Sequence, residues 1–185
     1  MIIGMTGTDG AGKGTVVDYL VREKGFEHYQ ARALILEEIA RRGVADDRNQ
    51  MRLVGNDLRR LHGNDYIIRT FLERARDQGA KNVIIDSLRT VAEAETLKAA
   101  GGIVLAVDAD QKLRYERVQK RRSSSDQVTF EQFRDHEELE KNDPDPHGMQ
   151  KQKVMEMADH VIYNDNHMDE LFANVEVFLK KFKPD

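Results

Sequence analysis

The chain of 185 residues contains no cysteine and no long apolar segment. Without cysteine it has no disulfide framework, and no thiolate can serve as a nucleophile or a metal ligand. The six histidines are scattered, so they predict no structural metal site. No apolar run approaches the ~20 residues that cross a bilayer, and no charged leader precedes the first apolar segment. We therefore expect a soluble, cytoplasmic protein that does not enter a membrane.

The sequence also lacks the positive charge that nucleic-acid binding requires. Its 29 lysines and arginines are outnumbered by 33 aspartates and glutamates, which gives a net charge of −4. Because non-specific binding to nucleic acid depends on a basic surface, we expect no such partner. No internal repeat divides the sequence, and its length is that of a single domain, residues 1–185. The pattern leaves open whether that domain is a monomer or a homodimer.

The N-terminal segment has the order strand, glycine loop, helix. The apolar run at residues 1–5 predicts a buried strand, and the helical pattern begins at Val16. Between them lies the glycine-rich segment Gly7–Thr15, which contains a lysine. This order is the context of a phosphate-binding P-loop. The structural alternative is a glycine-rich turn that binds nothing.

The residue types of this loop suit a polyphosphate. Glycines let backbone N–H groups approach the anion, because no Cβ blocks the contact, and the following helix adds the positive end of its dipole. Lys13 can reach the β and γ phosphates, and the Thr15 hydroxyl can bind Mg²⁺. We therefore predict ATP and Mg²⁺ as cofactors. The predicted nucleotide-binding residues of the loop are Asp9, Gly10, Ala11, Gly12, Lys13, Gly14 and Thr15.

Strand and helix patterns alternate along the rest of the chain. Two capping boxes, Thr90 with Glu93 and Thr129 with Gln132, mark helix starts. The alternation predicts a three-layer α/β/α fold with a parallel central sheet of about five strands. Helices are predicted at 31–42, 48–61, 66–78, 90–100, 110–122, 129–141, 149–157 and 168–181, and strands at 26–30, 81–86, 102–108 and 160–163.

Asp86 and Arg89 follow a predicted strand, at the sheet edge where ligands bind in this class of fold. A P-loop enzyme places the carboxylate that orders Mg²⁺ at such a strand end. The alternative makes Asp86 a turn residue and Arg89 a surface cation. Thr6, Asp108 and Asn164 also fall at strand ends, so the loops after them should face the same crevice.

Arginines occur on two further segments. Arg114, Arg117 and Arg121 share one face of the predicted helix at 110–122, and guanidinium groups bind phosphate bidentately. The alternative is a solvated basic face paired with the acidic helix near 131–140.

On the predicted helix at 48–61, the apolar face contains Met51, Val54, Leu58 and Leu61. The opposite face contains Asn56 and Arg59, which with Arg32 could form an acceptor site.

Several of these motifs resemble known kinases. The Gly-Lys-Gly-Thr ending of the loop resembles the nucleoside-monophosphate kinases, and Asp9 looks like the acidic residue of the thymidylate-kinase loop. Residues 84–89, with Asp followed three positions later by Arg, are similar to a segment of the nucleoside-monophosphate kinases. Residues 158–165 resemble the terminal strand and loop of the dephospho-CoA kinases. The resemblance implies an adenylate kinase-like fold, with acceptor-binding helices at about 31–78 and a lid at about 117–142.

The resemblance also implies an activity and residue roles. The activity is an ATP- and Mg²⁺-dependent phosphotransferase that acts on a small-molecule nucleotide, a nucleoside or deoxynucleoside monophosphate. A dephospho-CoA kinase-like enzyme and a nucleotide-dependent switch with a protein partner are the alternatives. The implied catalytic residues are Lys13, Asp86, Arg89, Arg117 and Arg121. The implied ligands of Mg²⁺ are Thr15 and Asp86. Arg117 and Asn164 are placed beside ATP. The implied acceptor contacts are Asp9, Arg32, Asn56, Arg59 and Arg89.

Overall fold

The computed structural model describes residues 1–120 and 128–182, apart from the side chain of Arg48. In this part of the chain five strands form one sheet with the order β2-β3-β1-β4-β5, and every neighbouring pair is parallel. The predicted sheet is therefore confirmed, including the short strand after the first helix. The strands are β1 (Ile2–Gly7), β2 (Glu27–Gln30), β3 (Val83–Asp86), β4 (Ile103–Asp108) and β5 (His160–Tyr163).

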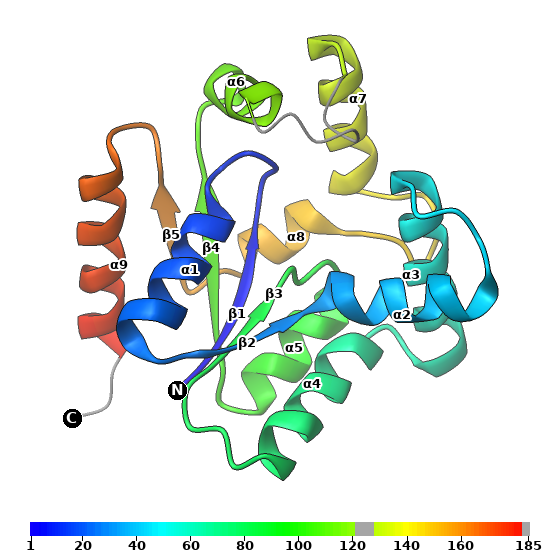
Figure 1. The fold of residues 1–185 in the computed structure, drawn as a ribbon, viewed down its shortest axis with the longest axis horizontal. Helices are drawn as coiled ribbons and strands as arrows, with labels where there is room; N and C mark the ends of the chain where they lie inside the picture. The colour runs from blue at the N-terminus through cyan, green and yellow to red at the C-terminus, as the bar shows by residue number, and fades with distance from the viewer. Residues whose placement is uncertain (121–127, 183–185) are drawn as a thin grey trace.

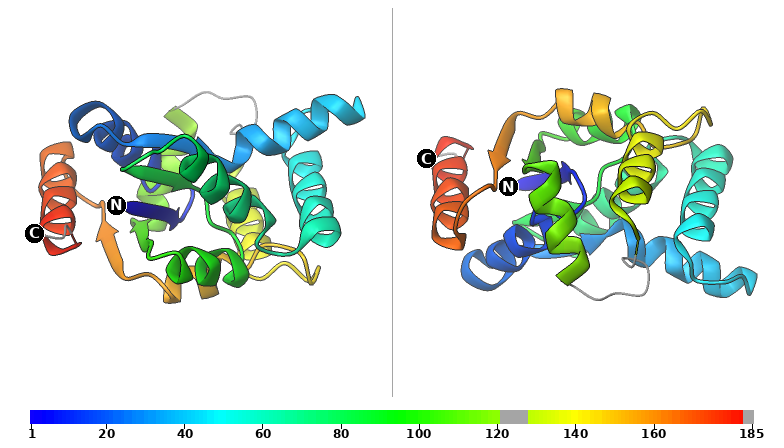
Figure 2. Two further views of the ribbon diagram at one scale, coloured as in Figure 1. Left: turned by 90° about the horizontal axis from the view of Figure 1, so that it is seen from below. Right: turned by 90° about the horizontal axis from the view of Figure 1, so that it is seen from above.

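Helices cover both faces of this sheet (Figures 1 and 2). Ile3 and Met5 of β1 are fully buried on the face that contacts α1 and α9. Gly4, between them, faces Leu88 and Leu97 on the other side. Alternate residues of one strand therefore enter two separate cores, which is the three-layer α/β/α arrangement. The covering helices are α1 (Lys13–Lys24) and α9 (Met168–Phe182) on one face, and α4 (Tyr66–Asp77), α5 (Val91–Ala99) and α8 (Lys151–Glu156) on the other.

Four helices lie outside these layers. Figure 1 shows α6 and α7 beyond the carboxyl ends of the strands and α2 and α3 side by side at one end of the sheet. The predicted lid, about 117–142, includes the end of α6 and all of α7, and the predicted acceptor-binding segment, about 31–78, includes α2, α3 and also α4. The roles of these segments stay predictions. Arg121 of the predicted lid lies outside the described residues. These helices are α2 (Ala31–Arg42), α3 (Arg48–His62), α6 (Gln111–Lys120) and α7 (Phe130–Lys141).

The local signals placed most helix starts correctly. Both capping boxes are formed, by Thr90 with Glu93 and by Thr129 with Gln132. The first helix begins at Lys13, before its apolar pattern starts, because the left-handed turn at Gly12 leads directly into it. Within the described residues, none of the helices has the length and apolar character needed to cross a membrane.

The predicted burial of α3 was wrong on one side. Leu61, predicted to be in the core, is 64% exposed, whereas Asn56 and Arg59 are only 3% and 2% exposed. The reason is a polar partner on a distant element, because Arg59 forms an ion pair with Glu93 of α5. This pair turns a polar face of α3 toward the protein.

Candidate active site

The glycine loop folds as a tight turn between β1 and α1. Gly10 and Gly12 have φ angles of +81° and +101°, which side chains rarely adopt. A Cβ at Gly10 would lie 2.5 Å from the carbonyl oxygen of Arg114, and a Cβ at Gly12 would lie 2.4 Å from Nδ2 of Asn164. The loop therefore lies against α6 and the β5–α9 loop, and its glycines are required by close contacts.

The N-terminus of α1 is open to an anion. It has no side-chain cap and no acidic residue in its first turn. The amides of Lys13, Gly14 and Thr15 have no hydrogen-bond acceptor among the described residues, and a Cβ at Gly14 would meet nothing within 4 Å. Free amides at a helix N-terminus, together with its dipole, bind phosphate. The loop therefore fits the phosphates of a nucleotide.

Lys13 lies inside this loop. Its Nζ donates hydrogen bonds to the carbonyl oxygens of Gly7 at 3.1 Å and Thr8 at 2.8 Å. Burial lowers the pKa of Lys13 to about 8, and Asp9, 3.9 Å from Nζ, opposes that effect. At neutral pH the ammonium is therefore charged and can bind a phosphate oxygen.

Asp86 lies at the end of β3, in register with Met5 of β1. Burial raises its pKa, but the nearby His28 ring, the hydrogen bond from Ser87 and the charges of Lys13 and Arg89 outweigh burial, so the pKa is below its usual value. Ser87 Oγ donates to Asp86 Oδ1 at 2.8 Å, and His28 Nε2 lies 3.8 Å from Oδ2. Asp86 is therefore ionised at neutral pH.

The oxygen donors near the loop suit Mg²⁺ carried by a nucleotide. Mg²⁺ commonly takes one or two protein oxygens and completes its shell with phosphate oxygens and water. The Asp86 carboxylate and the Thr15 hydroxyl are of this kind. Across residues 1–120 and 128–182, no group of three His, Cys, Asp or Glu could hold a metal by itself. The site thus fits a metal that is bound together with phosphate.

Arg89 presents an unsatisfied cation to the same region. Its Nη1 is buried and has no hydrogen-bond partner among the described atoms. Its charge lowers the pKa of both Lys13 and Asp86. A buried guanidinium N–H without an acceptor is costly unless a ligand supplies one.

Asn56 is similarly incomplete, because its Nδ2 donates to Asp145 at 3.2 Å while its Oδ1 is buried without a partner. Two other predicted acceptor residues, Arg59 and Arg32, are paired with carboxylates. Arg59 has its ion pair with Glu93 at 3.1 Å, and both side chains are at most 3% exposed. The Arg32 side chain is 64% exposed and lies 3.7 Å from Asp46.

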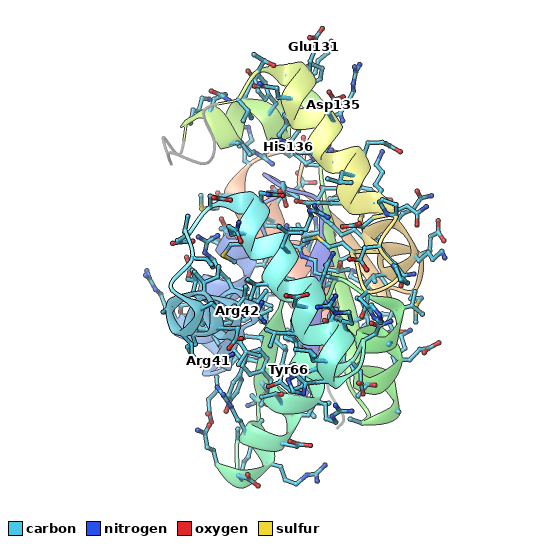
Figure 3. All side chains as sticks on the ribbon, turned by 90° about the vertical axis from the view of Figure 1, so that its right-hand side faces the viewer. Arg41, Arg42, Tyr66, Glu131, Asp135 and His136 are labelled. Carbon is cyan, nitrogen blue, oxygen red and sulfur yellow. The ribbon has the colours of Figure 1, made fainter. Side chains whose placement is uncertain are left out.

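Arg41 and Arg42 end α2, and both pair with Glu38 of the same helix. In Figure 3 they lie at α2, away from Glu131, Asp135 and His136 on α7.

Asn164 contacts the glycine loop directly, and Arg117 contacts it through Asn164. Asn164 Nδ2 donates to the Ala11 carbonyl at 2.8 Å. Arg117 Nη1 donates to the Asn164 carbonyl at 2.8 Å. In the ligand-free protein these residues therefore support the loop backbone. Their predicted contacts with ATP remain predictions.

Sequence reasoning did not predict that two cations beside the loop are buried. Arg114, expected either to bind phosphate or to lie on a solvated face paired with the acidic helix, is buried, pairs with Glu137 of α7 and donates to the Asp9 carbonyl at 3.1 Å. Lys151 of α8 is 4% exposed and lies 3.3 Å from the Asp9 carboxylate. The acidic composition of α7 was a signal for the first pair. No local pattern marks Lys151.

Comparison with known proteins agrees with this geometry. A family model described as an AAA domain, AAA_17, matches residues 6–134. A UPF0200 protein of Staphylothermus marinus is 30% identical over 183 residues, covering 97% of this chain and 92% of the relative. Among solved structures, TT1252 from Thermus thermophilus has a TM-score of 0.65 at 20% identity, covering 100% of this chain and 98% of that one. Shikimate kinase from Bacteroides thetaiotaomicron has a TM-score of 0.64 at 14% identity, covering 100% and 99%.

The fold and the loop therefore define an α/β protein of the P-loop kinase type. Within that class, the chain belongs to the UPF0200 family, and its residues 6–134 match the AAA domain model AAA_17. The likeness to shikimate kinase, at 14% identity, establishes the shared fold and assigns no acceptor.

Proposed function

We propose that this protein is a phosphotransferase that uses ATP with Mg²⁺ to phosphorylate a small anionic acceptor, with a nucleoside or deoxynucleoside monophosphate as the first candidate. Two features support the proposal: the open amides at the start of α1 and the cation at Lys13. The kinase-type fold is consistent with both. The motif resemblance favours a nucleotide acceptor over other anions.

In this reaction the protein would act by position and charge. Lys13 and the loop amides would hold the β and γ phosphates, and Thr15 and Asp86 would hold Mg²⁺, which supplies further neutralisation of phosphate charge. Phosphoryl transfer needs little covalent chemistry from the protein. No general base is therefore required of the site residues.

Arg89 is the observation that carries the acceptor assignment. Its buried, unpartnered Nη1 lies close enough to Lys13 and Asp86 for its charge to affect both. An anionic group on the acceptor would satisfy that N–H and bring the acceptor beside the transferred phosphate. Hydrogen bonds to charged groups contribute about 1.5–3 kcal/mol. Loss of the guanidinium should therefore raise the acceptor KM by roughly 10- to 100-fold.

An acceptor panel tests the proposal. ADP release would be measured with ATP, Mg²⁺ and each of the common nucleoside monophosphates, dephospho-CoA or shikimate, and with no acceptor. We expect release that depends on one acceptor class and is abolished in Lys13→Ala. Arg89→Met should raise the acceptor KM and leave the ATP KM nearly unchanged, whereas Arg76→Met, at an exposed position of α4, should change neither.

Two results would overturn the proposal. Slow hydrolysis that no acceptor accelerates would favour a nucleotide-dependent switch. Equal acceptor KM values in wild type and Arg89→Met would remove the assigned role of the arginine.

A further inference from the structure

A buried lysine enters the glycine loop from α8. Lys151 is the first residue of that helix and is 4% exposed. Its Nζ lies 2.8 Å from Glu140 Oε2 of α7 and 3.3 Å from Asp9 Oδ1 of the loop. The same oxygen of Asp9 lies 3.9 Å from Lys13 Nζ. Two ammonium groups therefore flank one carboxylate oxygen at the predicted phosphate site.

The backbone beside Lys151 is fixed to the segment that contains Arg89. The Gln150 amide donates to the Arg89 carbonyl at 2.7 Å, and Gln150 Oε1 accepts from the Val91 amide at 3.3 Å. Lys151 thus stands between the loop and the segment of the acceptor arginine. These contacts hold the backbone next to Lys151.

The helix α7 reaches Asp9 through two cations. Glu140 contacts Lys151, which contacts the Asp9 carboxylate. Glu137 contacts Arg114, which donates to the Asp9 carbonyl. Both glutamates are buried, at 8% and 5% exposed. Burying a charge is unfavourable unless it is well paired. The two buried glutamates, each in contact with a cation, therefore form a specific contact between α7 and the loop rather than a surface ion pair.

We propose that Lys151 is a positioning residue of the phosphate loop, which holds the Asp9 carboxylate between two ammonium groups and ties α7 to the loop. The inference rests on the proposed function only in that the loop binds the phosphates of ATP. It does not depend on the acceptor. Loss of Lys151 should break the link from Glu140 to the Asp9 carboxylate and so release α7 from the loop.

Lys13 and Lys151 share one oxygen of Asp9, at 3.9 Å and 3.3 Å. Replacing Lys151 with methionine removes one of these two ammonium groups and the link from Glu140 to the loop. The glycine loop and α7 should therefore open more often than in the wild type, and ATP binding to the loop should weaken.

The experiment is amide hydrogen exchange in the ligand-free protein, followed by calorimetry of ATP binding. We expect Lys151→Met to accelerate exchange over residues 8–15 and 130–141 together and to weaken ATP binding by roughly tenfold. Lys151→Arg should restore both. Lys153→Met, at an exposed position of the same helix, is the matched control and should change neither.

Glu140→Gln gives a second variant for the tie to α7. It should accelerate amide exchange over residues 130–141, and it also serves if Lys151→Met does not fold. Unchanged exchange over residues 8–15 in folded Lys151→Met, or unchanged exchange over residues 130–141 in Glu140→Gln, would overturn the inference. Because hydrogen exchange uses no substrate, a wild type that binds ATP but phosphorylates no acceptor would contradict only the proposed function.

Discussion

Replacing Glu93 with alanine should lower the free energy of unfolding by about 4 kcal/mol, because it breaks a buried ion pair. Glu93 Oε1 lies 3.1 Å from Arg59 Nε, and Oε2 accepts the amides of Arg89 at 2.6 Å and Thr90 at 3.1 Å. Removing one partner of a buried pair costs about 3–5 kcal/mol, since the other charge stays buried alone. For a chain of this length, that loss corresponds to a fall in Tm of roughly 8–16 °C.

Urea denaturation followed by circular dichroism measures this loss. Glu95→Ala is the matched control, because Glu95 is exposed on the same helix, and it should change stability by less than about 0.5 kcal/mol. The double variant Arg59→Met with Glu93→Met should be less destabilised than the two single changes added together, with a coupling of about 0.5–3 kcal/mol.

A loss below about 1 kcal/mol in Glu93→Ala would refute the reasoning, because the pair would then contribute no more than an exposed one. The same variants address the predicted acceptor role of Arg59. If the residue acts through the pair, Arg59→Met lowers stability and leaves the acceptor KM unchanged. A raised acceptor KM at unchanged stability would instead support direct contact with the acceptor.

Three further predictions concern the loop. Gly10→Ala should lower the free energy of unfolding, measured by urea denaturation, by about 1–3 kcal/mol, because its Cβ meets a backbone carbonyl at positive φ. Gly14→Ala should not lower it, because its Cβ meets nothing. Equal effects would contradict the loop geometry. Between pH 8 and 10.5 the free energy of unfolding should rise with pH, because Lys13 binds its proton more tightly in the unfolded chain than in the folded protein. Over the same range ATP affinity should fall, because Lys13 loses its charge. The same stability slope in Lys13→Met would argue against this. Asn164→Ala leaves the Ala11 carbonyl without its donor and should cost about 1–3 kcal/mol and weaken ATP binding by calorimetry; unchanged values would exclude a supporting role.

The sheet and the glycine loop could be predicted because their signals are local. Apolar runs that end at Gly7, Asp86 and Asp108 mark three strands, and positive-φ glycines mark the turn into α1. Parallel strands then place their carboxyl ends together by geometry alone. Asp86 and Lys13 were therefore brought into one region correctly.

The rest depends on partners that are distant in the sequence. Helical periodicity placed Arg59 opposite the apolar face of its helix, because nothing near it in the sequence shows that Glu93 packs against it. For the basic helix of Arg114, the sequence left open phosphate binding or a solvated face paired with the acidic helix; the structure pairs Arg114 with α7, and the pair is buried rather than solvated. Lys151 lies in a short helix without a motif, and only the fold brings it to Asp9. A single-sequence pattern can indicate that two charged helices pair, but it does not show that the pair is buried.

The most direct test of phosphate binding by the glycine loop is a crystal structure with Mg²⁺ and a non-hydrolysable ATP analogue. We expect the amides of Lys13, Gly14 and Thr15 to contact the phosphates. We also expect Lys13 Nζ to leave the carbonyls of Gly7 and Thr8 and to bind a phosphate oxygen. A triphosphate bound away from the start of α1, with Lys13 still held by those carbonyls, would contradict it.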